Sequence, residues 1–144
     1  MKLTAKAILV GCTLFAGLAY AADATDPTVK AWQELMDTQG GSMKVLGGMA
    51  GGEVPFDAAA AEAAKAALVA ASAQIGEKFM TQATDPASKA KPEIWTSWDD
   101  FLGDAKELSE AATALDTTTL DSLKAGLGAV GAVCKDCHTE FKAS

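Results

Sequence analysis

Several residue types are scarce in this chain of 144 residues. It contains no arginine and only one histidine and three cysteines, whereas nineteen acidic residues give it a net charge of −7. Such a charge has the wrong sign for binding nucleic acid and also disfavours anionic lipid surfaces. Any protein that it attracts electrostatically is expected to present a basic face.

The first residues have the pattern of a secretion signal. Lys2 and Lys6 accompany the apolar run Ala7–Leu18, and Ala19-Tyr20-Ala21 fits the rule of small residues at a cleavage site. The run is too short to span a bilayer, which favours secretion over a membrane anchor. An alternative is a lipoprotein signal ending at Cys12, but the residues that follow it remain apolar where a lipoprotein would turn polar.

Cleavage after residue 21 would leave a periplasmic protein of residues 22–144. This length suits a single domain with one core. Both signal lysines and no acid would be lost, so ten lysines would remain against nineteen acids, a net charge of −9.

The mature chain has no strand pattern, because β-branched residues never alternate with polar ones and apolar residues recur every three or four positions. Asp26-Pro27, Asp57 and Pro92 are typical helix starts, and Thr118 with Asp121 resembles a capping box. We predict helices over residues 27–47, 58–80, 92–115 and 120–141. Four amphipathic helices predict an all-α, antiparallel up-down-up-down four-helix bundle. Its alanine-rich core has little side-chain volume, and a large apolar cofactor would complete it.

The motif Cys134-Lys135-Asp136-Cys137-His138 lies near the C-terminal end of the last predicted helix. Positions i, i+3 and i+4 place Cys134, Cys137 and His138 on one helix face. C-x-x-C-H is the signature of covalent c-type haem attachment: the thiols add to the two vinyl groups and the imidazole reaches the iron. The motif therefore predicts one haem c, attached through Cys134 and Cys137, with His138 as the iron ligand.

Two other uses of these residues fit less well. A structural zinc site needs four ligands, and the chain offers no second cluster. A redox dithiol of the thioredoxin type would open a helix in a βαβ unit, whereas this motif ends a helix in a chain without strands.

A sixth iron ligand, if present, must come from upstream, because no histidine or methionine follows His138. The mature chain has four methionines, at positions 36, 43, 49 and 80. Met36 is the best candidate, because the early part of the first helix should face the end of the antiparallel fourth helix. A methionine on an apolar helix face is nevertheless usually a packing residue.

These residues resemble the class II c-type cytochromes, and cytochrome c′ in particular, over nearly the whole mature chain. The matching stretches are "GGEVPFDAAA", "KPEIW" and "VGAVCKDCHTEFK", together with Gln33 and Met36. The resemblance implies a left-handed bundle, often dimeric through its first two helices. Cys134 and Cys137 would be the thioether positions and His138 the proximal ligand.

The resemblance also gives Met36 two possible roles on the open side of the iron. In cytochrome c′ an apolar blocker stands there, and the five-coordinate iron binds small uncharged ligands such as NO and CO. In the low-spin branch of the same class, a methionine there is the sixth ligand and the protein carries electrons. Gly40, one turn later, either leaves room for a small ligand or permits close helix packing.

The sequence departs from the family pattern in two places. Trp32 stands where members commonly have an arginine that helps to hold a haem propionate, and Lys142 replaces a frequent arginine four residues after the proximal histidine. A lysine keeps the positive charge but lacks the planar fork of a guanidinium. Trp95 is expected either near the haem edge or as a core tryptophan.

Two functions follow as expectations. The first is a periplasmic cytochrome c′ that binds NO or CO at an iron guarded by Met36, and the alternative is an electron carrier with Met36 as sixth ligand. An enzyme is not expected, because no second histidine, arginine or paired carboxylate points to a distal catalytic site.

Overall fold

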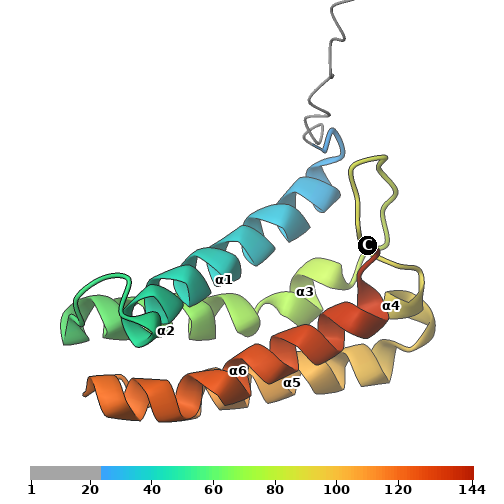
Figure 1. The fold of residues 1–144 in the computed structure, drawn as a ribbon. Coiled ribbons are helices and arrows are strands. Elements are labelled where there is room, and N and C mark those ends of the chain that lie inside the picture. The colour runs from blue at the N-terminus through green and yellow to red at the C-terminus, as the bar shows by residue number, and fades with distance from the viewer. Residues whose placement is uncertain (1–23) are drawn as a thin grey trace, which may run out of the picture.

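The protein is described here from a computed structural model, which covers residues 24–144. The predicted signal peptide and Cys12 lie outside the described residues. Four long helices form the bundle: α1 (Pro27–Gly51), α2 (Ala58–Ser72), α5 (Trp98–Ala114) and α6 (Leu120–Phe141). Two short helices, α3 (Ile75–Phe79) and α4 (Glu93–Thr96), lie between α2 and α5 (Figure 1). The predicted all-α four-helix bundle is confirmed.

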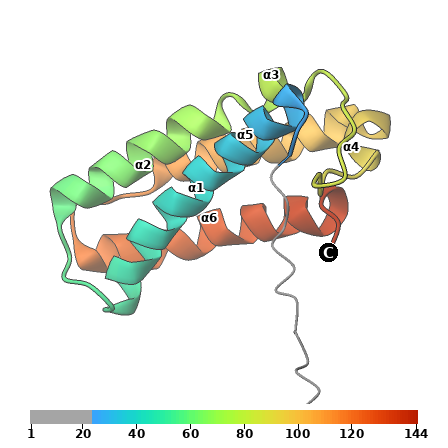
Figure 2. The same ribbon diagram turned by 90° about the horizontal axis from the view of Figure 1, so that it is seen from above.

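The four long helices are arranged in a ring in which each packs on two others. α1 packs on α2 and α6, and α5 packs on the same two helices (Figure 2). The core contains large aliphatic side chains with no exposed surface, namely Leu46, Leu68, Leu123 and Val130. Burying each stabilises the fold by about 1.5–3 kcal/mol.

The helix starts follow from side-chain caps. The Asp26 carboxylate accepts hydrogen bonds from the backbone N–H groups of Thr28 and Val29, and Asp57 accepts one from Ala60. The first helix continues four residues beyond the predicted end at residue 47. It ends at Gly51 and is capped by Gly52, whose positive φ of 77° suits a residue without Cβ.

The capping box of α6 lies one residue later than predicted. It is formed by Thr119 and Ser122 rather than by Thr118 and Asp121. Thr118 is not free to cap, because its backbone N–H and its hydroxyl both donate to the Asp116 carboxylate. That local turn leaves Thr119 as the N-cap, and the helix begins at Leu120, as predicted.

The predicted helix over residues 58–80 is interrupted after Ser72. The Ser72 hydroxyl donates to the Val69 carbonyl, and the Gln74 side-chain amide donates to the Ala70 carbonyl. Side chains therefore compete here with backbone N–H groups for the carbonyl oxygens of the helix. The chain resumes as α3, which directs Ile75 and Phe79 into the core. The third predicted helix is likewise split at Ser97, where φ of −120° and ψ of 48° leave the helical region.

The loop between α3 and α4 is fastened to both ends of the described chain. The Asp85 carboxylate accepts hydrogen bonds from the Thr25 N–H at 2.7 Å, the Asp26 N–H at 2.9 Å and the Ala87 N–H at 2.8 Å. On the other side, the backbone N–H of Lys91 donates to Phe141 and that of Ala143 donates to Lys89. The loop therefore closes one end of the bundle, between the start of α1 and the end of α6 (Figure 1).

Asp85→Asn should destabilise the protein most at neutral pH. Hydrogen bonds from Asp26, Ala87 and Thr25 lower the pKa of Asp85 well below its ordinary value, so the ionised form stabilises the fold. This stabilisation is complete above the unfolded pKa of about 3.9 and is lost as pH falls below it. Thermal unfolding from pH 7 to pH 2 should show a difference between wild type and variant that shrinks in acid.

Asp57→Asn is the matched control, because Asp57 accepts only one backbone N–H in the described structure. Its effect on the melting temperature should be smaller than that of Asp85→Asn. An Asp85→Asn protein as stable as wild type at pH 7 would show that this carboxylate does not fasten the loop.

Candidate functional site

A cavity of about 370 Å³ lies between the first half of α1 and the last turns of α6. Its size falls in the range of about 300–1,000 Å³ that is typical of small-molecule sites. Most of its wall is apolar and comes from α1, α3, α4, α5 and α6, including Val29, Ile75, Phe79, Ile94, Phe101 and Leu108. The loop between α3 and α4 closes its rim with Ala87, Ser88, Lys89 and Ala90.

The predicted attachment residues share one wall of this cavity. Cys134, Cys137 and His138 all line it from α6, as their helical spacing predicted. The two cysteines are half-buried free thiols, and the histidine is exposed at the rim. Within residues 24–144, no group of three or more His, Cys, Asp or Glu side chains is arranged to hold a metal ion, so the zinc alternative finds no ligand set there.

Both thiols are held in the protonated form. Burial raises the pKa of Cys134, whereas burial and then the Asp104 carboxylate raise the pKa of Cys137 to about 12. Because the thiolate is the reactive form, neither thiol should act as a redox centre at neutral pH without a cofactor.

The pKa of the His138 imidazole is lowered, first by desolvation at the cavity wall and second by the Lys142 ammonium. The neutral imidazole is the form that binds a metal, so His138 is in the correct protonation state at neutral pH.

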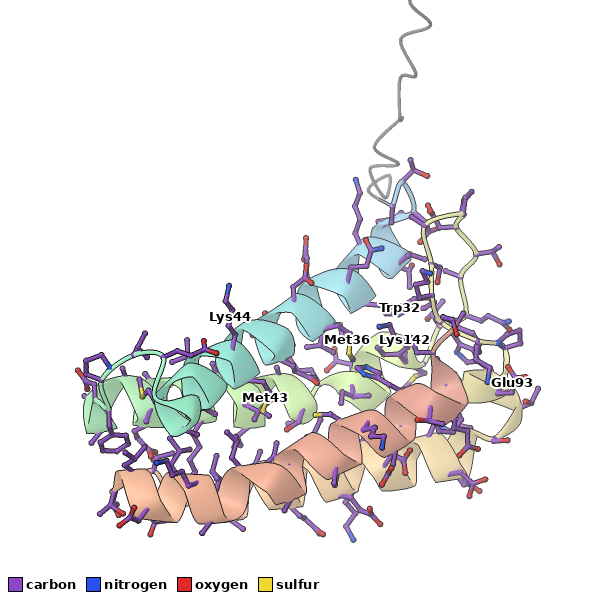
Figure 3. All side chains as sticks on the ribbon, in the orientation of Figure 1. Trp32, Met36, Met43, Lys44, Glu93 and Lys142 are labelled. Carbon is purple, nitrogen blue, oxygen red and sulfur yellow. The ribbon has the colours of Figure 1, made fainter. Side chains whose placement is uncertain are left out.

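Met36 lines the cavity from α1, the helix that packs beside α6. Figure 3 shows Met36 and Trp32 directed into the space between α1 and α6, with Lys142 alongside, whereas Lys44 points outward. The other methionines do not line the cavity, and Met80 is 69% exposed. Among the four candidates for a residue facing the iron, the structure places Met36 alone in the cavity.

Trp32, which replaces the family arginine, is a buried part of the cavity wall. Its ring stacks on Phe79 with centroids 4.9 Å apart, and its Nε1–H donates to the Lys78 carbonyl at 2.7 Å. Trp95 packs behind it, 5.5 Å away between centroids, and donates to the Phe79 carbonyl at 2.8 Å. Trp95 does not itself line the cavity and packs, partly buried, against the core beside Trp32.

Two polar residues that the family resemblance singled out lie at the cavity. Gln33 and Lys142 both line the cavity, and Gln33 Nε2 donates to the Ala87 carbonyl at 3.3 Å. Sequence reasoning missed Lys89, which lines the same rim from the loop, and Asp104, which lies beside Cys137. Their contributions depend on how the loop and α5 pack, which no local pattern in the sequence signals.

Gly40 does not line the cavity and does not pack closely on another helix of the described chain. It is exposed, and a Cβ placed there would meet no other atom within 4 Å. The neighbouring Gln39, which was not singled out, is buried and lines the cavity instead. Its spacing of three residues from Met36 was the available signal.

Comparison with known proteins identifies what this arrangement resembles. A family model described as Cytochrome C' matches residues 27–142. Cytochrome c-556 from Agrobacterium fabrum is 34% identical, with 99% of this chain and 95% of that protein covered. The structure titled cytochrome c' from Rhodobacter Spheriodes is 30% identical, with a TM-score of 0.75 and coverage of 81% of this chain and 95% of that one.

A third relative is solved as a nitric oxide complex. It is a mutant of cytochrome c prime from Alcaligenes xylosoxidans, 28% identical, with a TM-score of 0.71 and coverage of 81% and 94% of the two chains.

The thiols of haem-free protein should react slowly with iodoacetamide at pH 7, and Asp104→Asn should accelerate labelling of Cys137. Removing the nearby negative charge lowers the thiol pKa and raises the thiolate fraction. Mass spectrometry of timed samples would separate the two positions. Asp100→Asn, an exposed change on the same helix, is the control. Equal labelling of Cys137 in both variants would contradict the role given to Asp104.

Proposed function

This chain belongs to the cytochrome c′ family, whose cofactor is haem c, and we propose that Cys134 and Cys137 hold one haem c in the cavity. His138 is then its proximal ligand. The observation that carries this proposal is the presence of both thiols and the imidazole on one wall of an apolar cavity, with Met36 on the α1 side.

The residues present fit this cofactor. Phe79, Phe101 and Trp32 supply apolar and aromatic surface for the porphyrin faces. Lys89, Lys142 and Gln33 supply a cation-bearing rim suited to the propionates, in place of the missing arginine. When bound, haem supplies an iron that changes oxidation state and can bind small ligands.

We assign Met36 the role of an apolar guard on the side of the cofactor opposite His138. A half-buried, flexible thioether admits small uncharged ligands such as NO or CO and excludes bulkier ones. The nitric oxide complex of the Alcaligenes xylosoxidans relative supports the binding of such a ligand. We expect ligand binding and electron transfer rather than enzymatic turnover.

The second candidate function is electron transfer with Met36 as the sixth iron ligand. The similarity to cytochrome c-556 over 99% of this chain favours it. A methionine ligand raises the reduction potential, and the acidic surface would attract redox partners with basic faces. The two functions differ in one property, which is whether the Met36 sulfur is bound to the iron.

The proposed location is the periplasm, reached by cleavage of residues 1–21, with residues 22–144 as one domain. No helix in residues 24–144 is long and apolar enough to cross a membrane. We also propose a homodimer through α1 and α2, supported by a depression between these helices whose lining includes the small residues Ala31, Ala67, Ala70 and Ala71. Small side chains allow two helices to approach closely.

Replacing both cysteines by serine should abolish covalent haem attachment. Mass spectrometry of denatured wild-type protein should show the mature polypeptide plus one haem, whereas Cys134→Ser/Cys137→Ser should show polypeptide alone. Each single variant should retain one thioether bond. Haem that stays covalently bound in the double variant would overturn the assignment of these cysteines.

The absorption spectrum of purified holoprotein decides between the two roles of Met36. A guard predicts a high-spin spectrum that changes promptly when CO is added to reduced protein, and Met36→Ala should then bind CO faster. A sixth ligand predicts a low-spin spectrum with no response to CO, and Met36→Ala should create that response. CO binding that is the same in wild type and Met36→Ala would contradict both roles.

A further inference from the structure

One buried amide in the cavity wall has no hydrogen-bond partner. Gln39 is only 6% exposed, and its Nε2 is the single buried side-chain nitrogen or oxygen without a partner among residues 24–144. Burying an amide without a partner costs folding free energy, because its hydration is lost and not replaced. Such a group therefore calls for an explanation in terms of what occupies the cavity.

Other glutamines of the described chain show the usual arrangement. Gln33, two turns earlier on the same helix and also in the cavity wall, donates to the Ala87 carbonyl. Gln74, outside the cavity, donates to the Ala70 carbonyl. Among the described residues, Gln39 is thus the one glutamine whose amide nitrogen is buried without a partner.

Gln39 lies three residues after Met36, so the two side chains share one face of α1. The rise of the helix separates the two positions by about 4.5 Å along its axis. The cavity wall contains other polar side chains, including Asp37, Ser88 and Asp104, but none accepts a hydrogen bond from Gln39 Nε2. Because Gln39 lines the cavity, rotation of its side chain can present the amide to an acceptor held there on the Met36 side.

We propose that the Gln39 side-chain amide donates a hydrogen bond to the outer atom of a small uncharged ligand, such as NO or CO, held on the Met36 side of the cofactor. This inference rests on the proposed function and deepens it. Met36 restricts the size of the ligand. Gln39 slows the release of the ligand by donating a hydrogen bond to its oxygen. The propionates of a haem also accept hydrogen bonds. We assign them to the rim beside Gln33, so they are not the acceptor for Gln39.

The test compares wild type, Gln39→Leu and Gln74→Leu holoproteins as reduced CO complexes. A hydrogen bond to the oxygen of CO polarises the molecule and lowers its stretching frequency in the infrared. Gln39→Leu should therefore shift the C–O stretch to higher wavenumber and release CO about fivefold to tenfold faster, as expected for the loss of one hydrogen bond. Gln74→Leu should change neither value.

Thermal unfolding of the ligand-free holoproteins separates this role from a purely structural one. Gln39→Leu should melt at the same temperature as wild type or higher, because leucine replaces an unpaired buried amide. An unchanged C–O stretch and release rate in Gln39→Leu would overturn the proposal, whatever the melting temperature.

The same comparison in a Met36→Ala background covers the second candidate function. If wild type binds no CO but Met36→Ala does, the guard role of Met36 is wrong. The proposal for Gln39 is then tested by whether Gln39→Leu raises the C–O stretching frequency in the Met36→Ala protein. If neither protein binds CO, no ligand is held on this side and the proposal for Gln39 is wrong.

Discussion

The structure depends on one end of the bundle core remaining unfilled by side chains. Leu46, Leu68, Leu123 and Val130 are fully buried away from the cavity lining, but towards the C-terminal end of α6 the helices enclose a cavity of about 370 Å³. Protein interiors are otherwise close-packed, so an apolar space of this size weakens the fold until something occupies it. The cysteines and histidine of α6 face this space, and covalent attachment there would join the cofactor to the core that it completes.

The rest of the architecture keeps that space in shape. The break after Ser72 allows α3 to turn Phe79 under Trp32, and the Trp32, Phe79 and Phe101 rings form a continuous aromatic wall. Asp85 joins the loop to the start of α1, while backbone hydrogen bonds join it to the end of α6. Trp32, where the family resemblance implied an arginine, adds apolar surface to the cavity wall, while Lys89 and Lys142 supply positive charge to the lining.

Much of this could be predicted from the sequence, because it rests on local periodicity. Helical spacing predicted the four-helix bundle and the common face of Cys134, Cys137 and His138, and the antiparallel order predicted that Met36 would face them. The helix breaks at Ser72 and Ser97 were missed, because the apolar pattern continues through both. Gln39 and Lys89 were missed, because the packing of distant segments determines whether a polar side chain finds a hydrogen-bond partner.

The most direct measurement of the central claim is a crystal structure of the reduced, ligand-free holoprotein. The account predicts one haem c between α1 and α6, with thioether bonds to Cys134 and Cys137 and with His138 on the iron. It also predicts the Met36 side chain over the open face without a bond to the metal. A haem bound elsewhere, or an iron bonded to the Met36 sulfur, would contradict the account.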